Sequence, residues 1–419
     1  MIDKLVLQIP FSNAWVRTSA RIDSMDFDSP DPFSRSGIYF VDHHYLPIKK
    51  EAKTVTIQTD ETGKRTLLAE DIRCPWESLA SSHGGLAMKA YPDGNGFCNW
   101  PYLEIKCSPA KLTQGHNVYG FDDLGTASQN MLWVLHEFYP SMFGGLVQSP
   151  DFVGPPLPGF LNFDHIRVSE IDITYSVAVP SQIKRMAFIK AMHTLSKGQT
   201  KARGDSFETT SYFGSKNSKL KKIKVYLKGP EVDNEQKERK KKGRELIPDD
   251  VVKLSKNLVR IEATLKKEWL ERRGFPTNLH RLLSYLKGSG KDWYRNTFTD
   301  ATKDLWAALE GQEITVMSDD KIYKAIDRVH GDVRGKTARV FGFYQAIRAV
   351  GLETLKGQYN ERTFRRMVTD LRICGFSDAS LCSLHNGYGN VIQIAQVVNL
   401  SALHEPIPEG VEQVRLFAA

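Results

Sequence analysis

The 419-residue sequence is poor in cysteine: it has five, scattered along the chain, and no two of them form a C-x-x-C pair. This scatter argues against a cysteine-rich zinc site and against a disulfide framework. The chain also lacks an apolar run of about 20 residues, the length that spans a bilayer. Its first residues, MIDKLVLQIPF, have no basic region or small-residue cleavage site, and they predict a β-strand rather than a signal peptide. A reducing cytoplasm fits these absences.

Positive charge dominates, since 57 Lys and Arg against 49 Asp and Glu give a net charge of +8. Residues 197–273 hold 22 Lys or Arg and 12 Asp or Glu, an excess of ten that is larger than that of the whole chain. A local field of this sign is typical of proteins that bind a polyanion, and DNA or RNA is the first candidate. A solvated lysine surface is the alternative, and charge alone does not decide between the two.

Turn clusters and alternating segments dominate the first 130 residues, whereas helical patterns dominate from residue 276 onward. The predicted elements between them are helices at 123–140 and 181–198 (the second capped by Ser181 and ended by Gly198), a strand at 167–180, a segment at 257–270 that begins as a strand, and a hairpin at 208–228. Residues 229–250 are almost wholly polar and predict a solvated helix or a polar loop. This order favours an α+β fold, an antiparallel sheet with helices on its apolar face.

We expect three parts along the chain. Residues 1–275 would carry the sheet, residues 276–316 a helical connection, and residues 317–419 a mainly helical C-terminal domain. In the last part, residues 360–375 predict an amphipathic helix with Asn360 as its N-cap. Four arginines lie outside the apolar stripe of this helix, where they contact either phosphate or only water. These are Arg362, Arg365, Arg366 and Arg372.

Four predicted strands separate into an apolar and a polar face, because successive side chains of a strand point to opposite sides. The polar positions are Tyr102, Glu104 and Lys106; Glu170, Asp172 and Thr174; Lys222, Lys224, Tyr226 and Lys228; and Arg260, Glu262 and Thr264. With helices on the apolar face, these side chains gather on the other face. That face would combine carboxylates, cations and a tyrosine.

Asp172 and Glu262 are candidates for a metal site. Two carboxylates on neighbouring strands, with a histidine nearby, can hold a hard divalent cation, and His116 follows the YLEIKC strand. Other readings stay open. His116 can be a structural loop histidine, and the carboxylates can form ion pairs with Lys228 and Arg260 on a solvated sheet face.

Tyr226 shares its predicted strand face with three lysines. A free tyrosine has a pKa of about 10 and is a poor nucleophile at neutral pH, but neighbouring ammonium groups lower the pKa of a tyrosine by stabilising the phenolate. Attack of a tyrosine on phosphorus gives a protein–DNA phosphodiester and a free 3′-hydroxyl, and the retained bond energy allows rejoining without ATP. The alternative, that Tyr226 is a surface tyrosine among solvated lysines, stays open. Tyr212 in the hairpin is the rival nucleophile, whereas Tyr175 points to the apolar face.

These residues lie in segments that resemble the replication initiators of filamentous bacteriophages, the gene II protein family. The segments are MIDKLVLQIPF, EIKCSPAKLTQGHNVYG, EIDITYS, LSKGQTK, YLK, LVRIEA and RVFGFYQAIRAVG, and together they extend along nearly the whole chain. The order of EID, GS..S, VYLK and VRIE also resembles plasmid rolling-circle initiators of the Rep_trans type, on shorter patterns. The resemblance therefore implies a rolling-circle-initiator (HUH/Rep-like) form of the predicted sheet.

The resemblance implies a specific activity. Family members bind the viral origin in double-stranded replicative-form DNA and nick the viral strand. The nick leaves a 3′-hydroxyl that primes DNA synthesis by a host polymerase, together with a host helicase. They then cleave and circularise the displaced single strand. This implies a site-specific endonuclease and strand transferase in the cytoplasm of the bacterial host, with no membrane partner and with several copies on origin repeats. The competing classes are a non-catalytic origin-binding protein and a metal nuclease that uses water, with Tyr226 stacked on a base.

Carried onto this sequence, the resemblance assigns Tyr226 as the transient covalent nucleophile and Lys228 as its phosphate-neutralising catalytic partner. The residues that would hold Mg²⁺ are Asp172, Glu262 and His116. The residues that would contact DNA are Lys222, Lys224, Arg260, Arg362, Arg365 and Arg366.

Two further points follow from the resemblance. Relaxases and most rolling-circle initiators carry a His-hydrophobic-His metal motif, and this chain has none, so its metal ligands are less determined than its tyrosine. The family also produces a second, DNA-binding protein from an internal start. Met317 would begin such a product, made of residues 317–419.

Overall fold

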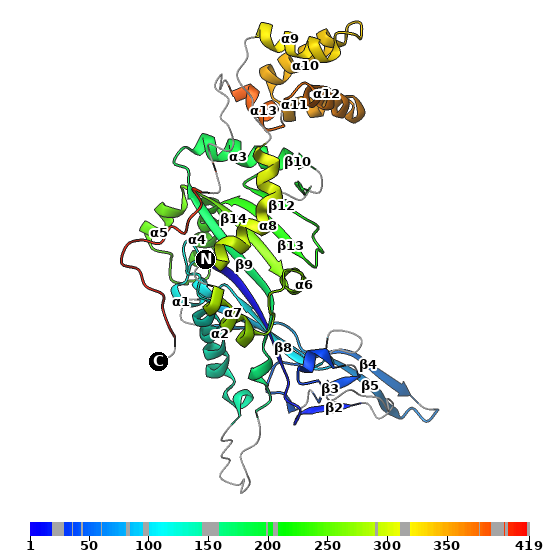
Figure 1. Ribbon diagram of the computed structural model, residues 1–419. Coiled ribbons are helices and arrows are strands. Elements are labelled where there is room, and N and C mark those ends of the chain that lie inside the picture. The colour runs from blue at the N-terminus through cyan, green and yellow to red at the C-terminus, as the bar shows by residue number, and fades with distance from the viewer. Residues whose placement is uncertain are drawn as a thin grey trace. The chain divides into compact units, whose positions relative to one another are not determined.

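The computed structural model of the chain contains an eight-stranded sheet (Figure 1). It describes residues 1–18, 29–35, 37–42, 45–59, 61–80, 84–94, 100–144, 159–197, 200–203, 208–289, 292–310, 319–376, 378–386, 398 and 401–416. The strand order is β12-β13-β14-β9-β1-β8-β7-β6, and each described register is antiparallel. The α+β class with a large antiparallel sheet is therefore confirmed, and the rolling-circle-initiator type of that sheet stays a prediction.

The strands follow the alternating segments of the sequence. The eight-stranded sheet consists of β1 (Ile2–Pro10), β6 (Glu77–Ala80), β7 (Gly85–Tyr91), β8 (Tyr102–Cys107), β9 (Arg167–Ala178), β12 (Thr210–Phe213), β13 (Lys221–Leu227) and β14 (Leu258–Lys266). Smaller two-stranded sheets pair β2 (Val16–Thr18) with β3 (Tyr39–Val41), β4 (Glu51–Thr59) with β5 (Arg65–Arg73), and β10 (Ser196–Lys197) with β11 (Thr200–Lys201). The predicted first strand, the strand at 167–180 and the hairpin at 208–228 are confirmed.

Some of the helices begin at side-chain caps. The helices are α1 (Pro109–Gln114), α2 (Leu124–Phe138), α3 (Gln182–Thr194), α4 (Lys228–Lys241), α5 (Asp249–Ser255), α6 (Lys267–Arg272), α7 (Leu279–Ser289), α8 (Trp293–Glu310), α9 (Asp319–His330), α10 (Lys336–Val350), α11 (Leu352–Gln358), α12 (Glu361–Ile373) and α13 (Asp378–Ser383). The side chains of Asp123, Ser181 and Asn360 accept backbone N–H groups of α2, α3 and α12. None of the described helices has the length and apolar character needed to cross a membrane.

Two helix predictions need adjustment. The helix predicted at 181–198 ends earlier, at Thr194, because the chain enters β10 at Ser196, and the predicted stop Gly198 lies outside the described residues. Residues 229–250 contain both predicted alternatives, since α4 ends at Lys241 and residues 242–248 form a loop before α5. A strand that leads directly into a helix brings Lys228 to the first position of α4.

The chain divides into two compact units that do not follow chain order. The first unit is Met1–Ile173, Leu265–Tyr294 and Ile407–Ala419, and the second is Thr174–Thr264 and Arg295–Pro406. The boundary passes through β9 and β14. The three-part division at residues 275 and 316 stays a prediction, and Met317 lies outside the described residues.

In the first unit, the strands bury one face and leave the other partly open. Leu5, Leu7 and Ile9 of β1 are fully buried, as are the β8 side chains of the same face. Helices α1 and α2 pack against β1 and β7 and cover this apolar face. The side chains of the opposite face keep partial exposure; these are Lys4, Gln8, Glu104 and Lys106. The predicted division of YLEIKC into two faces is confirmed.

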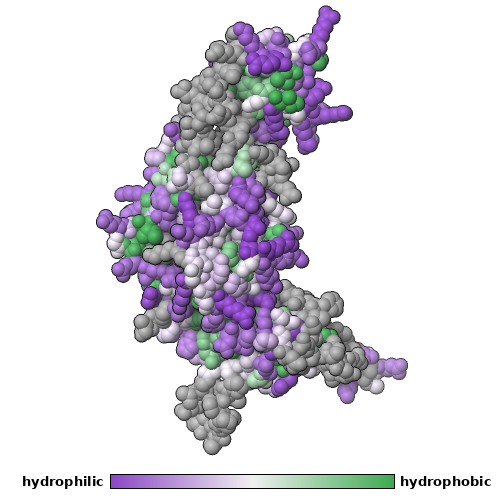
Figure 2. All heavy atoms as spheres, in the orientation of Figure 1, coloured by the Kyte–Doolittle hydropathy of each residue, from purple (hydrophilic) through white to green (hydrophobic). Residues whose placement is uncertain are grey.

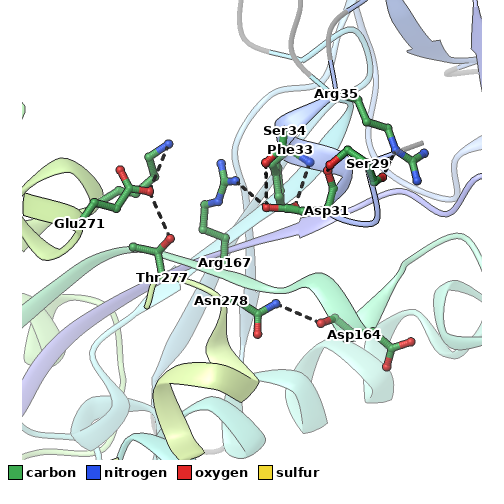
Figure 3. A network of polar contacts seen from close by, with 11 residues as sticks. Ser29, Asp31, Phe33, Ser34, Arg35, Asp164, Arg167, Glu271, Thr277 and Asn278 are labelled. Carbon is green, nitrogen blue, oxygen red and sulfur yellow. Dashed lines mark hydrogen bonds and ion pairs between the residues drawn. The ribbon is translucent and has the colours of Figure 1, made fainter. Parts of the chain in front are cut away.

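Arg167, at the start of β9, anchors the segment that contains the 3-10 helix η1 (Pro32–Ser34) (Figure 3). Its Nη2 lies 3.5 Å from Asp31 Oδ2, and its Cζ lies 4.0 Å from the centroid of the Phe33 ring. Asp31 also caps η1, because its Oδ1 accepts the backbone N–H of Phe33 at 3.1 Å. Burial lowers the pKa of Arg167 and the Asp31 carboxylate opposes that shift, so the guanidinium stays charged at neutral pH. Arg167 thereby fixes the position of Phe33 relative to β9.

In the second unit, both faces of the strands are largely buried. Helix α8 covers the apolar face, since the ring centroids of Tyr175 and Phe298 lie 4.9 Å apart and Lys221 Nζ donates to the carbonyl of Ala301 at 2.7 Å. On the other face, Thr174 and Ser176 are fully buried as well. The alternative of a solvated sheet face therefore does not hold at these two positions of EIDITYS. Period-2 alternation assigns a side chain to a face, but it does not say what covers that face.

The C-terminal helices α9 to α13 share a hydrophobic core of their own. Its buried members are Ile322, Ile326, Val340, Phe343, Tyr344, Ile347, Leu352, Leu355, Val368, Leu371 and Leu381. The predicted helix at 360–375 is confirmed as α12, and Gly375 follows it in the left-handed region with φ of 94°. Hydrophilic residues, purple in Figure 2, cover much of the described surface in that view.

Candidate functional site

Tyr226 lies on β13, one strand from the edge of the sheet (Figure 1). In the antiparallel pair of β12 and β13, Thr210 is opposite Tyr226 and Tyr212 is opposite Lys224. Opposite residues of such a pair project from the same face. Strand β14 adds Glu262 to this face, because Glu262 Oε2 lies 3.8 Å from Lys224 Nζ. The structure thus brings Lys224, Tyr226 and Glu262 together, as the alternation of their strands indicated.

Two ammonium groups lie over the ring of Tyr226. Lys224 Nζ is 3.9 Å from the ring centroid, and Lys228 Nζ is 5.8 Å from it. Both distances lie within the reach of about 6 Å at which a cation is attracted to an aromatic face. Tyr226 is only 2% exposed. The expectation that it lies on an open face is therefore wrong, because lysine side chains lie across its ring.

Lys228 occupies a helix terminus and not a strand position. Leu227 is the N-cap of α4, so Lys228 is the first helical residue. Its side chain is fully buried, and Nζ lies 2.9 Å from Glu231 Oε2, one helical turn further on. A buried ammonium group requires such a partner. Glu231 was missed from the sequence, although the i, i+3 spacing of Lys228 and Glu231 is a signal that could have found it.

Arg260 is also buried, with 0% exposure, and its Nε donates to Ser176 Oγ at 3.0 Å. A residue that contacts DNA phosphate must reach the surface. The prediction of Arg260 as a surface phosphate contact is therefore corrected: in this structure its guanidinium joins β14 to β9 inside the second unit.

Asp172 and His116 belong to the first unit, and each is 4% exposed. Asp172 on β9 lies opposite Lys4 of β1. The His116 ring stands edge-on to Tyr119, with centroids 4.8 Å apart, and its Nδ1 lies 3.4 Å from Gln114 Nε2. Glu262 belongs to the second unit. The structure therefore does not bring the predicted trio together within one unit.

Within the described ranges, no three His, Cys, Asp or Glu side chains lie close enough together to hold a metal ion. Mg²⁺ at phosphoryl-transfer sites commonly uses one or two carboxylates, water and substrate phosphates. Glu262 supplies one carboxylate of the kind that Mg²⁺ requires. In this structure that carboxylate is paired with a cation, the ammonium group of Lys224. The fit for Mg²⁺ rests on this one carboxylate.

The two alternative tyrosines have different surroundings. Tyr175 packs against Phe298 of α8 on the apolar face, on the opposite side of the sheet from Lys224, Tyr226 and Glu262. Tyr212 is half-buried, and the Cζ of Arg203 lies 5.0 Å from its ring centroid. Tyr212 therefore remains the rival of Tyr226, on the same face and one strand away.

The remaining predicted DNA contacts keep access to solvent. Lys222 and Lys224 on β13 are half-buried. On α12 the side chains of Arg362, Arg365 and Arg366 are exposed, and Arg365 forms an ion pair with Glu361. An exposed i, i+4 pair of this kind contributes little to stability, about 0.3–0.5 kcal/mol. These arginines are therefore available to an external anion.

Comparison with known proteins gives a consistent result. The family model for the N-terminal part of the phage replication-associated protein, the gene II protein, matches residues 1–287. The replication-associated protein of Salmonella phage IKe is 29% identical over 451 residues, which cover 100% of this chain and 97% of that protein. The proteins of the same name from Enterobacteria phages M13 and fd are each 27% identical over 427 residues, covering 96% of both chains. No solved structure shows significant similarity.

Proposed function

Because this chain belongs to the family of phage replication-associated proteins of the gene II type, we propose that it initiates phage DNA replication by nicking and rejoining one strand at a duplex origin. The shared name of the relatives supports a role in replication. The charge excess of residues 197–273 supports binding to DNA. The substrate class is the origin in double-stranded replicative-form DNA, and the second substrate is the displaced single strand.

In the proposed reaction, Tyr226 Oη attacks the scissile phosphorus and loses its proton to solvent or a base. The bond from phosphorus to the 3′-oxygen breaks, and that oxygen takes up a proton to become the 3′-hydroxyl primer. The 5′-phosphate stays on Tyr226 as a phosphotyrosine diester. Rejoining is the reverse attack by a 3′-hydroxyl, so no ATP is consumed.

The observation that carries this proposal is the pair of ammonium groups over Tyr226. Lys224 and Lys228 place positive charge 3.9 Å and 5.8 Å from the ring centroid. Such charge favours phenolate over phenol and also stabilises the negative charge of a phosphate in the transition state. A packing tyrosine would gain only a cation–π attraction from these groups, whereas a nucleophile would also gain charge stabilisation of its phenolate and of the phosphate.

Access of DNA to Tyr226 requires Lys224 to move. Its long side chain covers the ring and pairs with Glu262 at 3.8 Å. We propose that a DNA phosphate binds the ammonium group of Lys224 in place of the Tyr226 ring and the Glu262 carboxylate. This exchange uncovers Tyr226 and releases the carboxylate from its ion pair. Glu262 would be among the ligands of Mg²⁺, which would supply charge neutralisation at the scissile phosphate.

Two further elements complete the proposal. The exposed arginines of α12 would contact origin DNA beside the nick, and several copies would assemble on origin repeats. A host polymerase and a host helicase would extend and unwind from the nick. The internal-start product from Met317 would retain the C-terminal helices and bind DNA without nicking it.

The test is a nicking assay with supercoiled replicative-form DNA of the encoding phage. The wild-type chain is expected to convert supercoiled circles to nicked circles with Mg²⁺ and to lose this activity when EDTA removes the ion. Protein is expected to remain attached to the 5′ end after denaturation. A nick without attached protein would indicate hydrolysis by water, and origin binding without a nick would indicate a non-catalytic origin-binding protein.

Replacing Lys222 and Lys224 together by Ala is expected to weaken binding to any DNA. Removal of each phosphate contact reduces the slope of log K against log salt by about 0.9 for duplex DNA, so the slope should fall by about two. Fluorescence anisotropy at several salt concentrations measures this slope. Lys253 and Lys256, in and just after α5, provide a double-alanine control with the same change in charge. A slope equal to that of the control would show that the β13 lysines do not touch the backbone.

A further inference from the structure

Two lysines on the partly open face of the first unit lie over aromatic rings. Lys106 of β8 places Nζ 3.5 Å from the ring centroid of Trp76, and Lys89 of β7 places Nζ 4.7 Å from that of Tyr91. Within the part of the chain that the structure describes, neither ammonium group has a carboxylate oxygen within 4.0 Å. Both side chains are therefore cations whose contacts are rings and solvent.

The strand register places these groups side by side. In the antiparallel pair of β7 and β8, Ala87 is opposite Lys106, Lys89 is opposite Glu104, and Tyr91 is opposite Tyr102. Lys89 and Lys106 are therefore diagonal neighbours on one face, a spacing of about 7–8 Å. The small side chain of Ala87 leaves space beside Lys106. We call Trp76, Lys106, Lys89 and Tyr91 the lysine–aromatic row.

The row is accessible along its length. Trp76, just before the edge strand β6, is 40% exposed, which is high for so large an apolar side chain. Lys89, Tyr91 and Lys106 are half-buried. A ring that served only as core would be covered by the protein, whereas the exposed part of Trp76 can still be covered by a ligand.

The charges of this face favour an anion. Lys4 is already paired with Glu170, and Glu104 accepts from Gln8 Nε2 at 2.9 Å. Burial lowers the pKa of Lys106, and the positive charges of Lys4 and Lys89 act in the same direction, whereas the Glu104 and Glu170 carboxylates raise it. A phosphate group near Lys89 and Lys106 would form charge-assisted hydrogen bonds with both ammonium groups.

We propose that the lysine–aromatic row binds single-stranded DNA, with a base stacked on Trp76 and backbone phosphates at Lys89 and Lys106; the Tyr91 ring is itself stacked on Tyr102, with centroids 4.7 Å apart. Unpaired bases offer both π faces to a protein ring, whereas bases within a duplex are already stacked on one another. The row therefore selects single strands over duplex. This inference rests on the proposed function, in which a displaced strand must be held until it is rejoined.

The test is anisotropy with a fluorescein-labelled 15-nucleotide oligo(dT) and with a duplex of the same length. Trp76→Ala is expected to raise the Kd for oligo(dT) by about 5- to 100-fold, from the loss of one stacked base. Trp76→Phe should stay within about threefold of wild type, and the duplex Kd should change by less than about twofold. The matched control is Trp133→Ala on α2, a tryptophan that is 39% exposed in the same unit.

A second variant keeps the test decisive if Trp76→Ala does not fold. Lys89 and Lys106 replaced together by Ala should lower the salt slope for oligo(dT) by about 1.4, at about 0.7 per contact on a single strand. Equal affinities of the Trp76 and Trp133 variants, or an equal loss for duplex and single strand, would overturn the inference. If wild-type protein binds oligo(dT) through Trp76 but does not nick, the proposed function fails and this site stands. If it nicks and Trp76→Ala binds normally, only this site fails.

Discussion

Replacing Tyr226 by Phe is expected to abolish nicking while leaving origin binding and the fold intact. Phenylalanine keeps the ring that Lys224 and Lys228 cover, so the packing of this buried position is preserved. It removes the oxygen that would form the bond to phosphorus. Loss of a nucleophile typically costs on the order of 10³-fold or more in rate. The nicked fraction of supercoiled DNA measures the chemistry. Fluorescence anisotropy on the same protein samples measures binding, so the two effects are separated.

Tyr212→Phe is the matched control for this prediction. Tyr212 lies on the neighbouring strand, opposite Lys224, and it is more exposed than Tyr226. It should nick at close to the wild-type rate and should form the protein–DNA adduct. If the two variants exchange their behaviour, Tyr212 is the nucleophile. If both variants nick normally, the reaction uses water, and Tyr226 has another role on this face.

Arg260→Ala is expected to destabilise the protein by about 3 kcal/mol, since it empties a fully buried site and strips Ser176 of a partner. Urea unfolding monitored by circular dichroism should show a lower midpoint with an unchanged slope. Arg260→Met, which keeps most of the volume, should lose less stability. An exposed arginine, such as Arg366 replaced by Ala, should change the free energy of unfolding by less than about 0.5 kcal/mol.

The same variant distinguishes the two roles given to Arg260. A surface arginine that neutralises phosphate would leave stability unchanged when removed, and it would reduce the salt slope of DNA binding by about one. Removing a buried arginine would lower stability and leave the salt slope of DNA binding unchanged. Unchanged stability together with a reduced slope would contradict the buried position and restore Arg260 as a DNA contact.

Local patterns of the sequence predicted the elements well. The helix at 360–375 was predictable because its apolar stripe, its Asn360 cap and Gly375 all report on neighbours within one or two turns. The face of Lys224, Tyr226 and Glu262 was predictable because a strand has a side-chain period of two. Lys228 begins α4 and is not a strand residue, because β13 ends at Leu227, but its Nζ still lies 5.8 Å from the centroid of the Tyr226 ring.

By itself, the sequence determined the charge of this protein, the faces of its strands, the caps of its helices and its family, because each of these depends on composition or on residues close together in the chain. The tertiary structure decided which polar side chains are covered. Arg260 of β14 is buried beside Ser176 of β9, and Lys106 of β8 lies over Trp76, through contacts between separate elements. Periodicity along one strand contains no information about the partner that another strand or helix brings to it. Burial, and with it the chemistry available to each side chain, is set by those partners.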